Sequence, residues 1–148
     1  MGKILLGKFL ITGGQKVHRD WGVAIEGTQI KEIGPNSTLQ DKYNNYQVKD
    51  CRDKVIAPGF VNSHMHSYGV LSHGIPAPDV DSFESFLNDF WWPLVENRID
   101  HRMIEVTSRA MALELINSGV TTFANIMEAP KALPGALKTQ AEVLMNWE

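Results

Sequence analysis

The pattern of apolar and polar residues changes character near residue 55. Before it, the chain reads as short β-rich stretches separated by turn residues. ILLGKFLIT (residues 4–12) ends at two glycines, and GVAIEGTQIKEIGP (residues 22–35) places two apolar stretches around a turn at residues 26–28. The second pattern predicts a β-hairpin.

Two further features complete this N-terminal part. Ile30 and Ile33 have opposite parity within their strand, which predicts either a β-bulge or a strand buried on both faces. Residues 39–47 are polar and are expected to form a connection, and another pair of strands is expected about Arg52-Asp53. Together these elements predict a small antiparallel sheet.

A different pattern begins with VIAPGFVNSHMH (residues 55–66). This near-continuous apolar run predicts a strand buried on both faces, as in a parallel sheet. Pro58-Gly59 interrupts the run, and we expect the chain to cross there into a second structural unit. A loop rich in Gly, Pro and Asp follows, from Ser67 to Val80.

DSFESFLNDFWWPLVENRI (residues 81–99) has the spacing of a helix. Asp81 is expected to cap it, with Glu84 answering three residues later, and Pro93 to kink or end it. Large apolar side chains recur at helical spacing: Phe83, Phe86, Leu87, Phe90 and Leu94. The aromatic members, Phe83, Phe86 and Phe90, could line a pocket for a flat heterocycle together with Trp91 and Trp92, although such a stripe is more often core packing.

The remaining elements alternate. Asp100 is expected to cap a helix that stops at Gly119, VTTFANIM (residues 120–127) predicts a β-branched strand, and residues 136–148 predict a helix that is still running at the last residue. Strand, helix, strand, helix is the order that builds parallel sheets and barrels. We therefore predict an α/β fold with a boundary between residues 1–56 and 57–148.

Composition narrows the class of partner and the compartment. The net charge is −3 and the sequence has no basic stripe, so nucleic acid is not an expected partner. No apolar run approaches the roughly 20 residues that a membrane span needs. Cys51 is the only cysteine and excludes an internal disulfide, which favours a cytoplasmic protein.

His64 and His66 close the apolar run of residues 55–66. Side chains alternate along a strand, so both imidazoles are expected on one side, with Cβ atoms about 6.6 Å apart. Two such rings can hold one divalent ion, and sites in parallel α/β folds collect at the carboxyl ends of strands. The alternative reading, one buried and hydrogen-bonded histidine beside a solvent-exposed one, stays open on spacing alone.

The motif VIAPGFVNSHMH resembles the signature of the amidohydrolase superfamily at its first barrel strand. ILLGKFLIT and GVAIEGTQIKEIGP are similar to the small β-sandwich that precedes the barrel in the cytosine-deaminase and chlorohydrolase-like branch, and SGVTTFANI resembles the second barrel strand of that branch. The resemblance implies an incomplete (β/α)8 TIM barrel, its first two β/α units at 57–148, preceded by part of a β-sandwich at 1–56.

The same resemblance implies a chemistry. Members are metal-dependent hydrolases acting on carbon bonded to nitrogen, so His64 and His66 would be the first two ligands of a divalent metal. Zinc is the expected metal, and iron is the alternative. Such a metal lowers the pKa of its bound water to about 7 and so provides a nucleophile at neutral pH. We expect a small-molecule substrate, and deamination of a nitrogen heterocycle as the reaction.

Further ligands of the family, two histidines and an aspartate, cannot be assigned here. A complete barrel takes about 250 residues, and residues 57–148 provide 92. We therefore expect an inactive N-terminal fragment of an enzyme. The alternative is a non-catalytic remnant or half-protein that associates with a complementary C-terminal half; a homo-oligomer is the other expected assembly.

Other polar residues carry weaker expectations. Tyr68 and His73 follow the two histidines and are candidates for substrate contact, the alternative for His73 being an exposed loop residue. Glu128 ends the second predicted strand, where its side chain could reach the mouth of the barrel, but a solvated charge is the expected role. His101 and Glu105, one helical turn apart, could in principle bind a metal, but a surface pair is the expected role.

Overall fold

A computed structural model describes residues 2–14 and 16–146, and it separates the chain into two compact units, Met1–Pro58 and Gly59–Glu148. Each unit has its own apolar core. The first contains Ile4, Leu6, Ala24 and Leu39. The second is built around Tyr68, Val95, Ile99 and Ile104, with three alanines at 129, 132 and 136.

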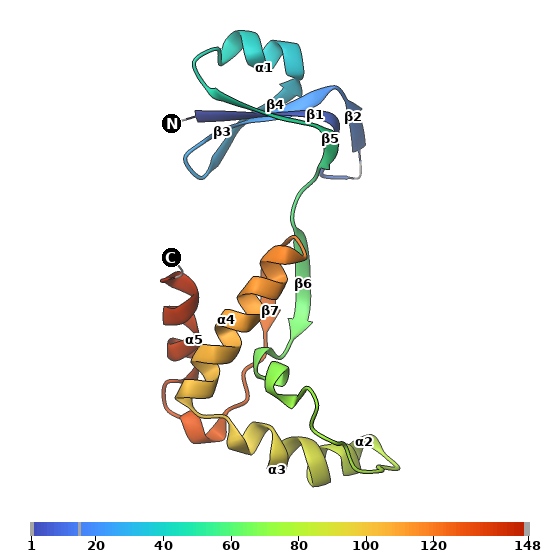
Figure 1. Ribbon diagram of the computed structural model, residues 1–148, viewed down its shortest axis with the longest axis vertical. Helices are drawn as coiled ribbons and strands as arrows, with labels where there is room; N and C mark the ends of the chain where they lie inside the picture. The colour runs from blue at the N-terminus through green and yellow to red at the C-terminus, as the bar shows by residue number, and fades with distance from the viewer. Residues whose placement is uncertain (1, 15, 147–148) are drawn as a thin grey trace. The chain divides into compact units, whose positions relative to one another are not determined.

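The first unit is a five-stranded sheet with one helix (Figure 1). Its elements are β1 (Gly2–Thr12), β2 (Lys16–Arg19), β3 (Trp21–Glu26), β4 (Gln29–Pro35), α1 (Asn36–Lys42) and β5 (Gln47–Ile56). Along one edge, β1 pairs antiparallel with β3 and then with β2, and along the other it pairs parallel with β5. The sheet is therefore mixed, and the expectation of an antiparallel sheet is wrong for its last strand.

The hairpin prediction is confirmed and the second strand pair is not. β3 and β4 join through a two-residue turn with Gly27 at φ 58°, and their register shifts next to Ala24, which is the expected bulge. About Arg52-Asp53 the chain does not turn. β5 continues through it as one strand, because the backbone there is taken up by pairing with β1.

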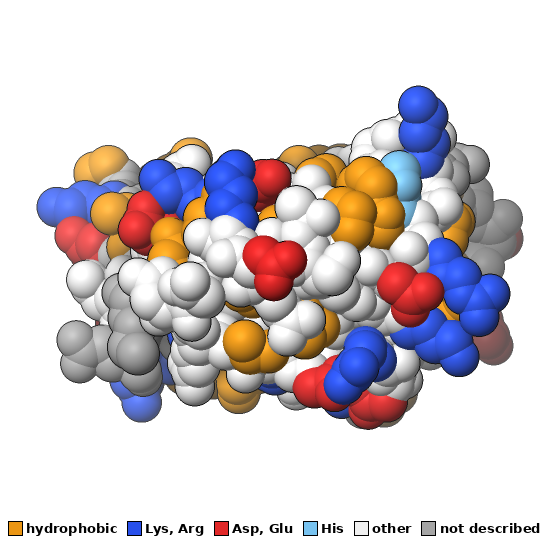
Figure 2. Space-filling model, turned by 90° about the horizontal axis from the view of Figure 1, so that it is seen from above, with side chains coloured by type: hydrophobic (Ala, Val, Ile, Leu, Met, Phe, Trp, Pro, Cys, Tyr) orange, Lys and Arg blue, Asp and Glu red, His pale blue; other side chains and the backbone are white. Residues whose placement is uncertain are grey.

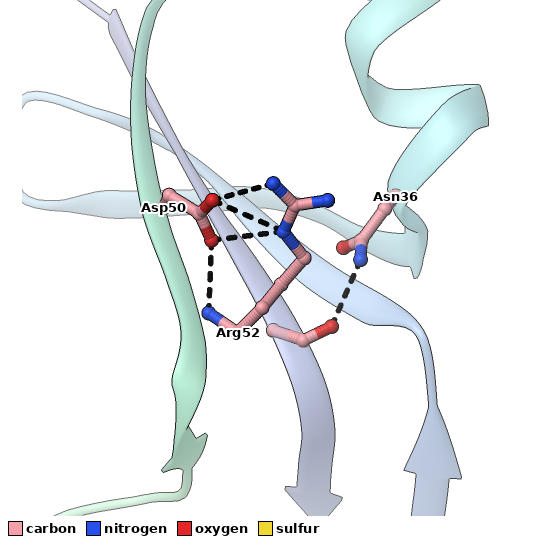
Figure 3. A network of polar contacts seen from close by, with 4 residues as sticks. Asn36, Asp50 and Arg52 are labelled. Carbon is pink, nitrogen blue, oxygen red and sulfur yellow. Dashed lines mark hydrogen bonds and ion pairs between the residues drawn. The ribbon is translucent and has the colours of Figure 1, made fainter.

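The helix α1 replaces the start of the connection that we expected at 39–47. It has one fully buried side chain, Leu39, so the sequence shows no apolar stripe there. Asn36, its first residue, donates a hydrogen bond from Nδ2 to the carbonyl of Gly7, at 2.8 Å (Figure 3). The helix is thereby tied to β1, and it links β4 to the parallel strand β5.

The second unit begins with β6 (Phe60–Met65), which pairs parallel with β7 (Val120–Asn125). Between them lie a 3-10 segment Ser67–Ser72, α2 (Phe83–Ser85), a π-helical segment Phe86–Trp91, α3 (Trp92–Leu94), a 3-10 segment Glu96–Arg98 and α4 (His101–Asn117). After β7 come a 3-10 turn Pro130–Ala132 and α5 (Ala136–Met145), so the order is strand, helices, strand, helix (Figure 1).

The strand β6 is less covered than its apolar sequence predicts. Phe60 is 70% exposed and Val61 is 68% exposed. Within residues 2–14 and 16–146 the strand pairs with β7 alone, so its other edge has no strand beside it. The prediction of a strand buried on both faces is therefore wrong for these two residues.

Both ends of α4 follow the prediction. The Asp100 carboxylate accepts a hydrogen bond from the Met103 amide at 2.8 Å, and Gly119 follows the helix at φ 75°, a conformation that favours glycine. The helix predicted for residues 136–148 is present as α5; its last two predicted positions, 147 and 148, lie outside the described residues.

The helix predicted for residues 81–99 is broken into several pieces. Its cap is Ser82, whose hydroxyl accepts from the Ser85 amide at 3.0 Å, while Asp81 accepts from the Ser85 hydroxyl instead. The helix widens into the π segment and ends at Leu94, just after Pro93. Of the five-residue stripe only Phe90 is buried, and Phe83 is 76% exposed.

Two surface properties bear on partners. In the part of the chain that is described, no helix is both long and apolar enough to cross a membrane. On the face shown in Figure 2, acidic and basic side chains are interspersed with hydrophobic ones.

Candidate metal centre

His64 and His66 lie together at the carboxyl end of β6. His64 belongs to the strand and His66 follows its last residue. Their ring centroids are 5.1 Å apart and the planes meet at 69°. His64 is exposed and His66 is partly buried. The pair therefore faces a common region, and its role as a metal site remains a prediction.

The backbone on each side of the pair is fixed by hydrogen bonds. The Ile126 amide, just beyond β7, donates to the Met65 carbonyl at 2.9 Å. The Ser67 amide donates to Oδ1 of Asn125 at 2.8 Å. These contacts hold the chain that carries His66 against the end of β7.

A buried polar network extends this attachment to α5. Gln140 is only 6% exposed, and it accepts from Nδ2 of Asn125 at 3.0 Å and donates to the Ser67 hydroxyl at 2.9 Å. Asn125 thus bridges the loop after β6 and the helix after β7. Ser67 and Gln140 are buried and Asn125 is half-buried, and all three find hydrogen-bond partners within the protein.

Tyr68 connects His66 to two carboxylates. Its side chain is fully buried, and its hydroxyl lies 2.9 Å from Nδ1 of His66, 3.0 Å from Oε1 of Glu96 and 2.9 Å from Oε2 of Glu128. Glu96 also accepts from the indole nitrogen of Trp91 at 2.7 Å. We call these five residues the Tyr68 cluster.

Electrostatics within the Tyr68 cluster separate its two carboxyl groups. Burial raises the pKa of Glu96, and its hydrogen bond with Glu128 raises it further. Glu128 is more exposed, and hydrogen bonds from Glu96 and Tyr68 lower its pKa. Burial likewise raises the pKa of the Tyr68 hydroxyl, followed by its hydrogen bonds to Glu128 and Glu96. One carboxyl therefore holds a proton more readily than the other.

A hollow of about 400 Å³ lies beside His66. His66 and the carboxylates of Glu96 and Glu128 form part of its wall. The rest of the wall consists of side chains from the π segment and from residues next to it: Phe83, Phe86, Leu87, Trp91 and Trp92. Phe86 and Trp91 stack with centroids 5.7 Å apart. Core packing was the expected role of the aromatic stripe. Most of its side chains line this hollow instead, and Phe90 is the member that is buried.

The two histidines are suitable metal ligands, but they are fewer than a catalytic metal site needs. Two imidazoles suit zinc, whereas a catalytic zinc site usually has three protein ligands. Among residues 2–14 and 16–146, no group of three or more His, Cys, Asp and Glu side chains is arranged to hold a metal. His64 and His66 are therefore candidates for two of the ligands.

Of the other residues singled out in the sequence, one lies at the site and the rest do not. His73 is exposed on the loop after the 3-10 segment Ser67–Ser72 and does not line the hollow beside His66. His101 hydrogen-bonds Thr139 at 2.8 Å and Glu105 pairs with two arginines, so neither points to a metal. Tyr68 lies in the cluster behind His66, and contact with substrate stays a prediction for it and for His73.

Two residues of the Tyr68 cluster escaped the sequence reading. Glu128 lies three residues beyond the end of β7, and its place after a strand is a signal in the sequence, although a solvated charge is the reading that the sequence favours. Glu96 gave no signal, because its position depends on the extra residue of the π segment, which shifts Trp91 and all that follows out of the regular helical register.

Comparison with known proteins places these features in a family. The model of the amidohydrolase family matches residues 55–147. A 5'-deoxyadenosine deaminase of Methanobrevibacter smithii is 38% identical over 102 residues, 69% of this chain and 22% of that protein. A 5-methylthioadenosine/S-adenosylhomocysteine deaminase of Pelotomaculum thermopropionicum is 31% identical over 126 residues, 85% of this chain and 28% of that protein.

Solved structures give the same fold. A mutant of atrazine chlorohydrolase from Arthrobacter aurescens, complexed with zinc and atraton, superposes with a TM-score of 0.78 at 21% identity, covering 97% of this chain and 33% of that one. The chain thus spans between a fifth and a third of the proteins it matches. Since the family model covers more than half of its residues, the chain belongs to the amidohydrolase family.

Proposed function

We propose that this chain supplies the first two metal ligands, His64 and His66, of a hydrolase that acts on carbon–nitrogen bonds outside peptides. The observation that carries the proposal is the pair itself: two imidazoles 5.1 Å apart at the carboxyl end of β6, beside an aromatic hollow. When bound, a divalent metal supplies the Lewis acidity that makes water a nucleophile near neutral pH. Zinc is the expected metal, with iron as the alternative.

The reaction that we propose is hydrolytic deamination of a nitrogen heterocycle. Both relatives named above are deaminases of adenosine-type compounds. The hollow has the matching chemistry: Phe86 and Trp91 offer stacked aromatic faces to a flat ring, and Glu96 and Glu128 can accept hydrogen bonds from amino or hydroxyl groups. Tyr68 and His73 remain candidates for contact with the substrate.

The architecture that we propose for this function is the first part of a (β/α)8 barrel. In this proposal β6, α4, β7 and α5 are its first two β/α units, and the sheet of residues 1–56 is part of a β-sandwich before them; the element order strand, helix, strand, helix supports it. A barrel of this kind places its active site at the carboxyl ends of the strands, where His64 and His66 lie. The proposed compartment is the cytoplasm.

We further propose that residues 1–148 are inactive by themselves. Two imidazoles make a weak metal site, and the missing donors would come from later strands of the barrel, within a longer chain or from a complementary C-terminal half. The exposed apolar residues of β6, Phe60 and Val61, favour such a partner, because a closed barrel would pair the free edge of β6 with another strand and cover both faces of the strand.

The test combines this chain with the missing part. We expect no ammonia release from 5'-deoxyadenosine or S-adenosylhomocysteine by residues 1–148 alone, and metal-dependent release when the chain is co-expressed with the C-terminal portion of the Methanobrevibacter relative. His64→Ala and His66→Ala should each abolish that release, while His18→Ala, in β2, serves as the control. Full activity of either ligand variant would refute the proposal.

A further inference from the structure

The Tyr68 hydroxyl is the meeting point of three polar side chains at a fully buried position. His66, Glu96 and Glu128 each place one atom within 3.0 Å of the phenol oxygen. They come from three segments: the end of β6, the 3-10 segment Glu96–Arg98 and the residues after β7. The ring itself is 0% exposed and packs in the core with Val95 and Ile99. Neither ring nor hydroxyl has freedom to turn away.

Counting hydrogens settles the direction of these bonds. A phenol has one hydrogen to donate, and an ionised carboxylate can only accept. The Tyr68 hydroxyl lies within donating distance of a carboxylate oxygen of Glu128, at 2.9 Å, and of Glu96, at 3.0 Å, so its single hydrogen is committed to one of these two carboxylates. The phenol oxygen then has only lone pairs left for His66, so Nδ1 of His66 must carry the hydrogen of their 2.9 Å contact.

We propose that Tyr68 is a positioning residue that holds His66 as the Nδ1–H tautomer, with the lone pair of Nε2 presented to a metal. The inference rests on the proposed role of His66 as a ligand and deepens it. A neutral imidazole binds a metal through its unprotonated nitrogen, and the hydrogen bond made by the other nitrogen decides which one that is. Tyr68 supplies that bond here.

The carboxylates make the arrangement stiffer than a lone tyrosine would. Glu96 also accepts a hydrogen bond from the indole of Trp91, at 2.7 Å. A chain of hydrogen bonds therefore runs from His66 through Tyr68 and Glu96 to Trp91, which lines the hollow. Three segments that are distant in sequence therefore set the direction of one imidazole.

The first test reads the tautomer in the metal-free chain. Ring nitrogen chemical shifts in mildly alkaline solution should show His66 protonated at Nδ1, and Tyr68→Phe, which removes only the hydroxyl oxygen, should move it to the Nε2–H form or to a mixture. Tyr43→Phe is the matched control, because Tyr43 also donates to a glutamate, Glu32, but lies in the first unit. An Nε2–H tautomer of His66 in the unaltered chain would overturn the inference, even if Tyr68→Phe failed to fold.

The second test measures affinity. Competition with a chromogenic chelator should show zinc bound about 10–100-fold more weakly by Tyr68→Phe, the range typical for loss of a hydrogen bond that orients a ligand, with no change for Tyr43→Phe. His66→Ala separates the two proposals. If it leaves zinc affinity unchanged, the proposed ligand role fails; if it abolishes binding while Tyr68→Phe binds as tightly as the unaltered chain, only the positioning role fails.

Discussion

At the scale of single residues, Asp50 and Arg52 form a polar pair within three consecutive residues of β5. Asp50 and Arg52 are alternate residues on β5, and so their side chains lie on one face of the strand (Figure 3). Arg52 donates from Nε to Oδ1 of Asp50 at 2.9 Å, and its backbone amide donates to the same oxygen at 3.0 Å. Both bonds favour the ionised carboxylate.

These bonds predict an unusual titration. The side-chain and backbone hydrogen bonds from Arg52 lower the pKa of Asp50 from 3.8 to about 2. Because the folded pKa lies below the unfolded value, the stabilisation is present above the ordinary pKa of Asp and is lost as the pH falls through about 2. Carboxyl carbon shifts followed against pH should show a midpoint near 2.

The matching variant is Arg52→Ala, in which the midpoint of Asp50 should return toward 3.8. Arg19→Ala is the control, because Arg19 pairs loosely with Asp20 at 3.9 Å. A midpoint near 3.8 in the unaltered chain would contradict the hydrogen bonds described for Asp50.

At the scale of elements, the sequence predicts those whose pattern is local. The β3–β4 hairpin and its bulge follow from turn residues and parity, and α4 follows from Asp100 and Gly119. The strand pair predicted about Arg52-Asp53 is wrong, because the partner of β5 is β1, which lies more than 40 residues earlier and leaves no local trace in the sequence. The π segment was missed for a related reason, since one extra residue in a turn is set by packing rather than by spacing.

The candidate site divides in the same way. The histidine pair is visible in the sequence because both residues lie in one short motif at a strand end. The Tyr68 cluster is not, because its hydrogen bonds join Tyr68 to Glu96 and Glu128, at 28 and 60 residues' distance. Polar contacts between residues far apart in the sequence can be recognised only once the fold is known.

The helix α1 offers a test at this scale. Leu39 is fully buried and belongs to the core of the first unit with Ile4, Leu6 and Ala24. Leu39→Ala should lower the free energy of unfolding by roughly 2–5 kcal/mol, the usual cost of such a truncation in a core. Val17→Ala, at a position in β2 that is 63% exposed, should change it far less. Urea denaturation measures both, and equal effects would show that α1 is not anchored as described.

At the scale of the whole molecule, the short length relative to the family and the exposed strand edge both predict association with another chain. The chain corresponds to between a fifth and a third of its relatives, and β6 presents Phe60 and Val61 to solvent. An open, apolar strand edge can pair with another chain. Residues 1–148 in isolation should therefore associate with one another as their concentration rises.

A charge on that edge should weaken the association. We expect Val61→Lys to lower the light scattering of concentrated samples, because a lysine at a strand edge opposes pairing. Leu137→Lys is the matched control: Leu137 is 67% exposed but lies on α5, away from any strand edge. If the two variants behave alike, or if the unaltered chain stays monomeric, the edge is not what drives association.

The π segment has a consequence for how this protein tolerates changes of length. In an α-helix each residue turns the chain by about 100°, so deleting one residue within Phe86–Trp91 would swing Phe83 and the loop before it around the helix axis while Trp91 stayed bonded to Glu96. The aromatic lining would then open on one side without the loss of any aromatic residue. Substitutions should be accepted in this stretch more readily than insertions or deletions, because the number of residues, more than their identity, sets the shape of the hollow.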